Sequence, residues 1–166
     1  NITARNKLHR IFHFFKQKES LLNVEGLVNV CHKLGTTHTG ALIVIERSVP
    51  LDFVIATGDK MNLELSGPII ESIFYKNSPL HDGAIVIRGN TIVATRVILP
   101  VAAEDTLPKH YGLRHRAAVS ITEKTDALAL VVSEETGKIS YINNSEFVPY
   151  SSDSELVAIL TEALSK

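Results

Sequence analysis

Apolar and polar residues along this chain switch between helical and extended spacing, and each switch marks a predicted element. Residues 3–18 form a basic segment whose apolar positions recur at helical spacing: Leu8, Ile11, Phe12 and Phe15. This spacing predicts an amphipathic helix, which either packs on the domain or serves as a juxtamembrane or regulatory helix. Residues 23–34 predict a second helix, with Asn23 as its N-cap and Gly35 as its end.

Short apolar runs bounded by turn residues predict the strands. They cover residues 41–45, 53–56, 84–88, 91–99, 127–133 and 138–143. The run at 41–45 is apolar throughout, which suits a strand covered on both faces. Arg88-Gly89-Asn90-Thr91 and Glu135-Thr136-Gly137 mark the hairpin turns.

Three more helices are predicted, over residues 62–75, 113–123 and 153–165. Asn62 is a plausible cap of the first, and Pro68 is its awkward interior residue. Ser152 or Asp153 caps the last. Hairpins interleaved with helices predict a single domain of the α/β class, with a mixed sheet and helices on both faces.

The bulk composition narrows the class of protein. The 166 residues are 45% hydrophobic and 21% charged, which fits one domain with a real core. A net charge of −1 gives no broad electrostatic case for nucleic-acid binding, so any anion site is local. The single cysteine, Cys31, excludes an intramolecular disulfide and is either a small core residue or a nucleophile. No apolar run approaches the roughly 18 residues that span a bilayer.

The first candidate chemistry precedes the predicted strand 84–88. His81 and Asp82 stand side by side, directly before Gly83 and Ala84. A carboxylate at the mouth of a buried strand is costly unless it is paired, solvated or metal-bound. Asp82 is therefore either a turn residue or a group that binds a metal or polarises a hydroxyl. His81 is either structural or a metal ligand, and Gly83 and Ala84 are small enough for a ligand to approach the backbone.

The second candidate is the run Arg114-His115-Arg116, at the start of the predicted helix 113–123. Cations are normally disfavoured in the first turn of a helix, but a bound phosphate there would supply the missing negative charge. The alternative is a basic surface turn whose stems pack on the core. Two small residues follow directly, Ala117 and Ala118, and they favour a buried, positioned cluster.

Ser133-Glu134-Glu135 end the predicted strand 127–133. Adjacent acids at a hairpin are either solvated turn residues or part of a site at the strand end. The chain contains neither the Walker pattern nor G-x-G-x-x-G, so a bound nucleotide would need another arrangement.

Taken together, three motifs closely resemble the diadenylate cyclase domain of the membrane-associated bacterial type. They are Pro79-Leu80-His81-Asp82-Gly83-Ala84, Gly112-Leu113-Arg114-His115-Arg116-Ala117-Ala118 and Val131-Val132-Ser133-Glu134-Glu135-Thr136-Gly137. Gly40-Ala41-Leu42-Ile43-Val44-Ile45-Glu46-Arg47 resembles the first core strand of that domain. The resemblance covers about residues 35–143. It implies a mixed sheet of about seven strands flanked by helices. We expect residues 35–166 to form this catalytic domain and residues 1–34 to form an N-terminal helical segment.

The resemblance also implies an activity: two ATP molecules are joined into cyclic di-AMP and two pyrophosphates are released, with Mn²⁺, Mg²⁺ or Co²⁺. Carried over, Asp82 would orient or activate the ribose 3′-hydroxyl and His81 would ligate the metal. The nucleotide pocket would be lined by Gly83, Ala84 and Leu99, with the adenine near Leu99. The triphosphate would be held by Arg114, His115 and Arg116. Near the phosphates and the metal would lie Ser133 and Glu134 or Glu135.

Each subunit of that family binds one ATP, so the resemblance implies a homodimer whose subunits react face to face. It also implies a cytoplasmic domain of a protein anchored in a membrane by a segment outside this sequence. Leu113 departs from the Thr or Ser that the family usually has, which costs one hydrogen bond if that hydroxyl contacts the ligand. The alternatives are a nucleotide-binding regulatory module with weakened turnover and a nucleotidyl transferase with another acceptor.

Overall fold

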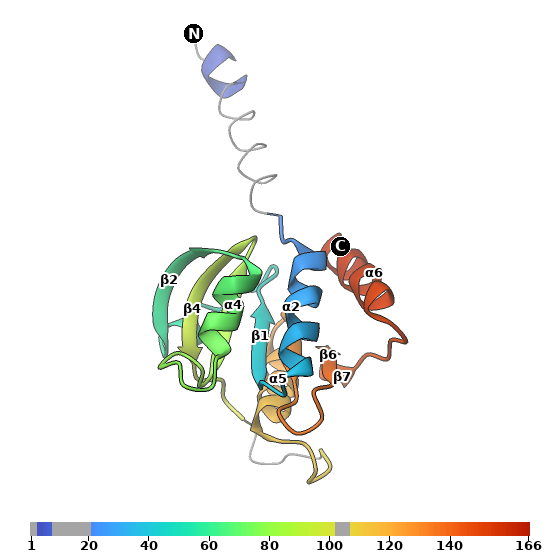
Figure 1. The fold of residues 1–166 in the computed structure, drawn as a ribbon. Coiled ribbons are helices and arrows are strands. Elements are labelled where there is room, and N and C mark those ends of the chain that lie inside the picture. Colours follow the sequence, from blue (N-terminus) through green and yellow to red (C-terminus); the bar gives the residue numbers. More distant parts are fainter. Residues whose placement is uncertain (1–2, 8–20, 102–106) are drawn as a thin grey trace.

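The computed structural model describes residues 3–7, 21–101 and 107–166, and its centre is one mixed sheet of seven strands (Figure 1). The strand order is β2-β4-β3-β1-β5-β6-β7. The bounds are β1 (Ala41–Ile45), β2 (Asp59–Glu64), β3 (Ala84–Arg88), β4 (Thr91–Val97), β5 (Leu128–Val132), β6 (Ile139–Asn143) and β7 (Glu146–Phe147). Strands β1 and β3 pair in parallel, and the other described pairs are antiparallel. The predicted mixed α/β sheet is confirmed.

Helices cover both faces of the sheet (Figure 1). One face carries α2 (Val24–Thr36), α4 (Gly67–Phe74) and α6 (Asp153–Leu164), and the other carries α3 (Asp52–Ile55) and α5 (Leu113–Lys124). Strand β1 shows why: Ile43 and Ile45 pack with the first group, whereas Leu42 and Val44 pack with the second. A strand buried on both faces needs the uninterrupted apolar run that the sequence has at 41–45.

Between residues 51 and 75, the predicted strand is wrong and the predicted helix is right only from Gly67 onward. The segment 53–56 lies in the short helix α3, where the Leu51 N–H donates to the Glu46 carboxylate at 2.9 Å. The predicted helix 62–75 begins too early, because β2 occupies 59–64 and α4 starts only at Gly67. The side chain of Ser66 caps α4, and Pro68 stands in its first turn, where a missing N–H costs nothing.

The other predicted helices occur close to their expected bounds. Asn23 caps α2 by accepting from the Gly26 N–H at 3.0 Å, and Ser152 caps α6 by accepting from the Glu155 N–H at 3.1 Å. Helix α2 runs through Gly35 to Thr36 instead of ending at the glycine. Cys31 is fully buried in α2, and burial raises the pKa of its thiol to about 12, as a core residue requires.

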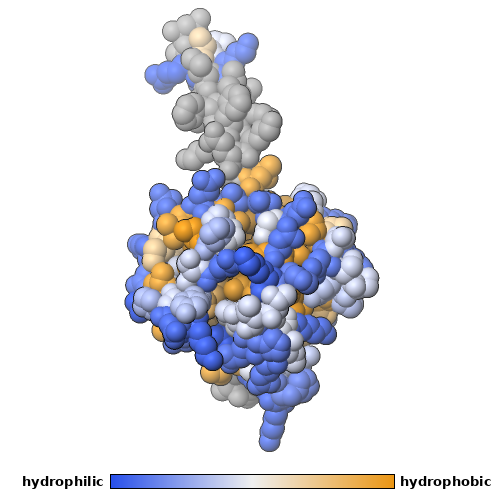
Figure 2. All heavy atoms as spheres, viewed as in Figure 1, coloured by the Kyte–Doolittle hydropathy of each residue, from blue (hydrophilic) through white to orange (hydrophobic). Residues whose placement is uncertain are grey.

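Most of the predicted N-terminal helix, 3–18, lies outside the described residues. Its described part, residues 3–7, is helical. Within the described ranges, no helix is both long and apolar enough to cross a membrane. On the face drawn in Figure 2, hydrophilic side chains cover most of the surface and apolar atoms show between them.

A close backbone contact joins the end of α2 to the β5–β6 turn. A methyl group added at Gly35 would lie 2.3 Å from the carbonyl oxygen of Gly137. We therefore expect Gly35→Ala to lower the free energy of unfolding by about 1–3 kcal/mol, although alanine usually stabilises a helix. Urea unfolding measures the loss. Gly67→Ala is the control, because its methyl would meet nothing within 4 Å, and equal stability of both variants would contradict the expectation.

Candidate active site

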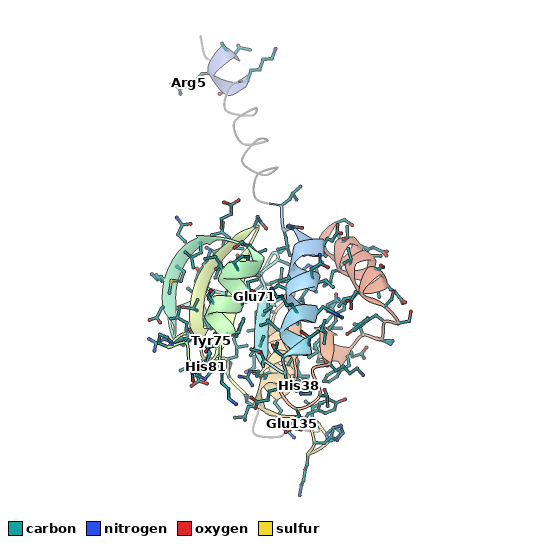
Figure 3. The ribbon with its side chains drawn as sticks, viewed as in Figure 1. Arg5, His38, Glu71, Tyr75, His81 and Glu135 are labelled. Carbon is teal, nitrogen blue, oxygen red and sulfur yellow. The ribbon has the colours of Figure 1, made fainter. Side chains whose placement is uncertain are left out.

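A cavity of about 690 Å³ opens at one end of the sheet, where β1 and β3 begin and β4 and β5 end. Strands β1, β4 and β5 supply apolar lining, including Leu42, Val97 and Val131. Of the twelve residues singled out from the sequence, ten line this cavity: His81, Asp82, Gly83, Leu99, Leu113, Arg114, His115, Ser133, Glu134 and Glu135. Figure 3 shows His81, from the α4–β3 connection, and Glu135, from the β5–β6 turn, at this same end.

Gly83 holds a backbone conformation that only glycine adopts without strain. Its φ is +84°, and a Cβ atom would lie 2.8 Å from the backbone of Arg96 and Val97. The neighbouring strand is bulged there, because Ala84 and Val86 on β3 face Val97 and Ala94 on β4. Arg96 has φ +53° in this bulge, and its Nε donates to the Asp59 carboxylate at 2.5 Å. The bulge therefore fixes the turn that carries Asp82.

His81 and Asp82 lie next to each other at the cavity wall, and both side chains carry atoms of the kind that ligate metals. The Nδ1 of His81 lies 2.7 Å from the carbonyl oxygen of Ser78, which can only accept, so Nδ1 donates this hydrogen bond. The other ring nitrogen, Nε2, lies 3.6 Å from Oδ1 of Asp82 and is the nitrogen left to ligate a metal. The side chain of Asp82 is 88% exposed. Within the described residues no group of three metal-ligating side chains occurs, so further donors would come from a ligand or water.

Arg114 enters the cavity from the first turn of α5. Its Nη1 lies 3.7 Å from a carboxylate oxygen of Glu134, and its side chain is 27% exposed. The guanidinium also lies over Gly40, where an added Cβ would come within 2.5 Å of Nη1. Gly112 caps α5 without a side-chain hydrogen bond, so the helix start is suited to an anionic ligand.

Arg116 and Ala84 are the two predicted residues that the cavity leaves out. Arg116 donates from Nη2 to the carbonyl of Pro108 at 3.0 Å and from Nε to that of Tyr111 at 3.2 Å. The guanidinium thus braces the loop before α5 instead of lining the cavity. Ala84 is fully buried in the sheet beside Val97.

The imidazole of His115 has a lowered pKa in this site. Burial lowers the pKa of its imidazole, Arg114 and His110 lower it further, and Glu135 opposes them. Its ring lies 5.2 Å from that of Tyr111. A second cavity, of about 600 Å³, shares His115, Ser133 and Glu135 with the first. Because its pKa is lowered, His115 serves as a hydrogen-bonding group at neutral pH and does not add a cation beside Arg114.

The turn after β5 positions the acidic side chains. The Ser133 hydroxyl accepts from the N–H groups of Glu135 and Thr136, both at 3.2 Å. This turn carries Glu134 and Glu135 to the cavity wall. Leu99 is 6% exposed, whereas Leu113 is 78% exposed at the rim.

Sequence reasoning missed several residues of the site. Lys76, Ile98 and Val101 line the cavity, and Gly40 makes room for Arg114. Lys76 stands five residues before His81, close enough along the chain to have been considered. The sequence marks Gly40 only as the start of a strand motif, because its contact with Arg114 joins positions 74 residues apart.

Comparisons with known proteins agree with this geometry. Residues 28–147 match the family described as "DAC: DisA bacterial checkpoint controller nucleotide-binding". The chain is 50% identical over 105 residues to diadenylate cyclase CdaS of Bacillus thuringiensis, covering 63% of this chain and 52% of that protein. The chain thus spans about half the length of this relative.

Two solved structures share the fold. A double mutant of DacA from Staphylococcus aureus superposes with a TM-score of 0.80 at 35% identity, covering 85% of this chain and 94% of that one. A hypothetical membrane spanning protein from Bacillus cereus gives a TM-score of 0.72 at 42% identity, covering 76% of this chain and 62% of that one.

Proposed function

The chain belongs to the DAC family of nucleotide-binding domains, and from this premise we propose that it is a diadenylate cyclase. The substrate is ATP, and the products are cyclic di-AMP and pyrophosphate. The observation that carries the proposal is one cavity lined by Asp82 and His81 on one wall and by Arg114 at the start of α5. This combination offers a carboxylate for a hydroxyl or metal and a guanidinium for phosphate oxygens.

The reaction makes two phosphodiester bonds. The ribose 3′-oxygen of each ATP attacks the α-phosphorus of the other, and the bond from that phosphorus to pyrophosphate breaks. Asp82 orients the 3′-hydroxyl and receives its proton. The protein has little covalent chemistry to perform in this reaction. Positioning of the reactants and neutralisation of their charge therefore supply most of the catalysis.

The other side chains bind and orient the nucleotide. Gly83 brings the backbone close to the nucleoside, and Leu99 meets the adenine. Arg114, His115 and the N–H groups at the start of α5 hold the phosphates. Ser133 keeps the turn that presents Glu134 and Glu135 beside them.

A divalent cation, Mn²⁺, Mg²⁺ or Co²⁺, fits the donor pair of His81 and Asp82. The free Nε2 of His81 and the exposed carboxylate of Asp82 are 3.6 Å apart, which supports joint ligation with the remaining ligands from phosphate and water. Bound there, the cation would offset phosphate charge.

Incubation of the protein with ATP and Mn²⁺, with mass spectrometry of the products, tests the proposal. We expect cyclic di-AMP and two pyrophosphates per product molecule. A product joined to another acceptor would indicate a different nucleotidyl transferase. Tight ATP binding without any product would indicate a regulatory module of the same fold, for which the missing hydroxyl at Leu113 is the relevant change.

Two copies are needed, because each cavity takes one ATP and the product joins the AMP units of two ATP molecules. We infer a face-to-face homodimer in which large apolar side chains at the rim approach the partner. Three of them are unusually exposed: Ile98, Val101 and Leu113.

A transient dimer predicts that the rate per subunit depends on protein concentration. At saturating ATP and Mn²⁺, dilution from micromolar to nanomolar protein should lower the specific activity, because fewer subunits are paired. Sedimentation velocity across the same range should show the dimer declining in parallel. A specific activity that stays flat while only monomer sediments would contradict the face-to-face mechanism.

We also infer that the parent protein is anchored in a membrane, with this domain in the cytoplasm. The similarity to a membrane spanning protein of Bacillus cereus and the basic, amphipathic pattern of residues 3–18 support this location. Fractionation of cells producing the natural full-length protein tests it, since recovery in the soluble fraction alone would contradict anchoring.

A further inference from the structure

We propose that Lys76 binds the phosphates of the nucleotide, facing the site from the wall that carries His81 and Asp82. The inference rests on the proposed function and adds to it a residue that the sequence motifs did not indicate. Lys76 follows Tyr75, the C-cap of α4, and lines the same cavity as Arg114. Figure 3 shows Tyr75 beside His81, at the end of the molecule where the cavity opens.

The charge balance of the cavity is the first argument. Among the described residues, its lining includes three carboxylates, Asp82, Glu134 and Glu135, but only two lysine or arginine side chains, Lys76 and Arg114. A nucleoside triphosphate is a polyanion and needs cationic partners. A lining in which carboxylates outnumber these cations therefore requires both of them, together with the divalent cation.

The engagement of the other basic side chains is the second argument. Arg114 already lies 3.7 Å from Glu134, and Arg116 donates to the carbonyls of Pro108 and Tyr111. The lowered pKa keeps His115 neutral. Lys76, by contrast, is exposed and forms no ion pair with any described residue. Among the described residues of the lining, Lys76 is thus a cation with no carboxylate partner to give up when a phosphate binds.

The place of Lys76 in the chain is the third argument. The turn after α4 is held by the Ser78 N–H, which donates to the Tyr75 carbonyl at 2.8 Å. Ser78 in turn accepts from His81 through its own carbonyl. Lys76 therefore lies in the same hydrogen-bonded α4–β3 connection as His81 and Asp82. Its flexible side chain lets the ammonium reach the phosphates of a bound nucleotide.

Calorimetric titration with α,β-methylene-ATP and Mn²⁺ tests this contact without requiring turnover. We expect Lys76→Gln to weaken binding of the analogue by about 10-fold, and binding of AMP by less than about 2-fold. Lys76→Arg should restore most of the affinity, because it restores the charge. Raising the salt concentration should weaken analogue binding less in Lys76→Gln than in the unchanged protein.

Lys60→Gln is the matched control. It removes the same charge from an exposed position on β2 that does not line the cavity, so its affinity should equal that of the unchanged protein. Thermal unfolding of Lys76→Gln should also be unchanged, because the side chain packs in no core. Unaltered affinity in Lys76→Gln, or equal losses for the analogue and AMP, would overturn the assignment.

The same measurements separate this inference from the function on which it rests. If the protein forms cyclic di-AMP but Lys76→Gln binds the analogue normally, the role of Lys76 alone is wrong. If the analogue binds and Lys76→Gln weakens it, yet ATP gives no cyclic product, the cyclase activity alone is wrong. If the unchanged protein does not bind the analogue, both are wrong.

Discussion

Asp82→Asn is expected to lower the rate of cyclic di-AMP formation by about 1,000-fold, because the amide cannot accept the 3′-hydroxyl proton and is a poor metal ligand. The Kd for ATP should change by less than about 3-fold, since Arg114 and the start of α5 still hold the phosphates and His81 still offers a nitrogen to the cation. The side chain is 88% exposed, so folding should be unaffected. Product formation is followed by chromatography and mass spectrometry, and Kd by calorimetry.

Asp52→Asn makes the matching change away from the cavity. Asp52, the first residue of α3, is likewise exposed, at 74%, and its carboxylate lies 3.2 Å from Nη2 of Arg88 at the end of β3. Its loss should leave turnover unchanged. Near-normal product formation by Asp82→Asn, or a comparable loss in Asp52→Asn, would remove Asp82 from the reaction.

The fold was predictable where local and tertiary requirements coincide. The run at 41–45 is apolar because both faces of β1 are covered, and Asn23 and Ser152 satisfy helix N–H groups within their own turns. The failures at 53–56 and at the start of 62–75 have different causes. A four-residue apolar run has no resolvable period, and the alternation of β2 reflects its place at the sheet edge beside β4.

The candidate site was predictable to the extent that its residues form contiguous motifs. His81 and Asp82 are neighbours along the chain, and so are Glu134 and Glu135, so each pair reaches the cavity together. The motifs did not predict the direction in which each side chain points. Arg114 and Arg116 are two residues apart in one helical turn and point to different places, because the carbonyls of the 108–111 loop capture the second guanidinium.

That difference predicts unequal consequences for the two arginines. Arg114→Ala should weaken ATP binding by roughly 10- to 100-fold, since it removes a charge-assisted phosphate contact. AMP binding should weaken by less, because AMP lacks the outer phosphates. Arg116→Ala should instead lower thermal stability by releasing the loop before α5, and any loss of affinity should be similar for ATP and AMP. Calorimetry with both nucleotides, alongside thermal unfolding, measures the contrast.

Lysine substitutions separate the loss of charge from the loss of the guanidinium at these two arginines. Arg114→Lys retains a charge but loses the planar guanidinium over Gly40, so it should recover only part of the ATP affinity. Arg116→Lys should recover little of the lost stability, because one ammonium cannot reproduce the bonds to both Pro108 and Tyr111. If Arg116→Ala instead loses ATP affinity selectively while keeping its unfolding temperature, Arg116 turns into the cavity when nucleotide binds, and both arginines hold the phosphates.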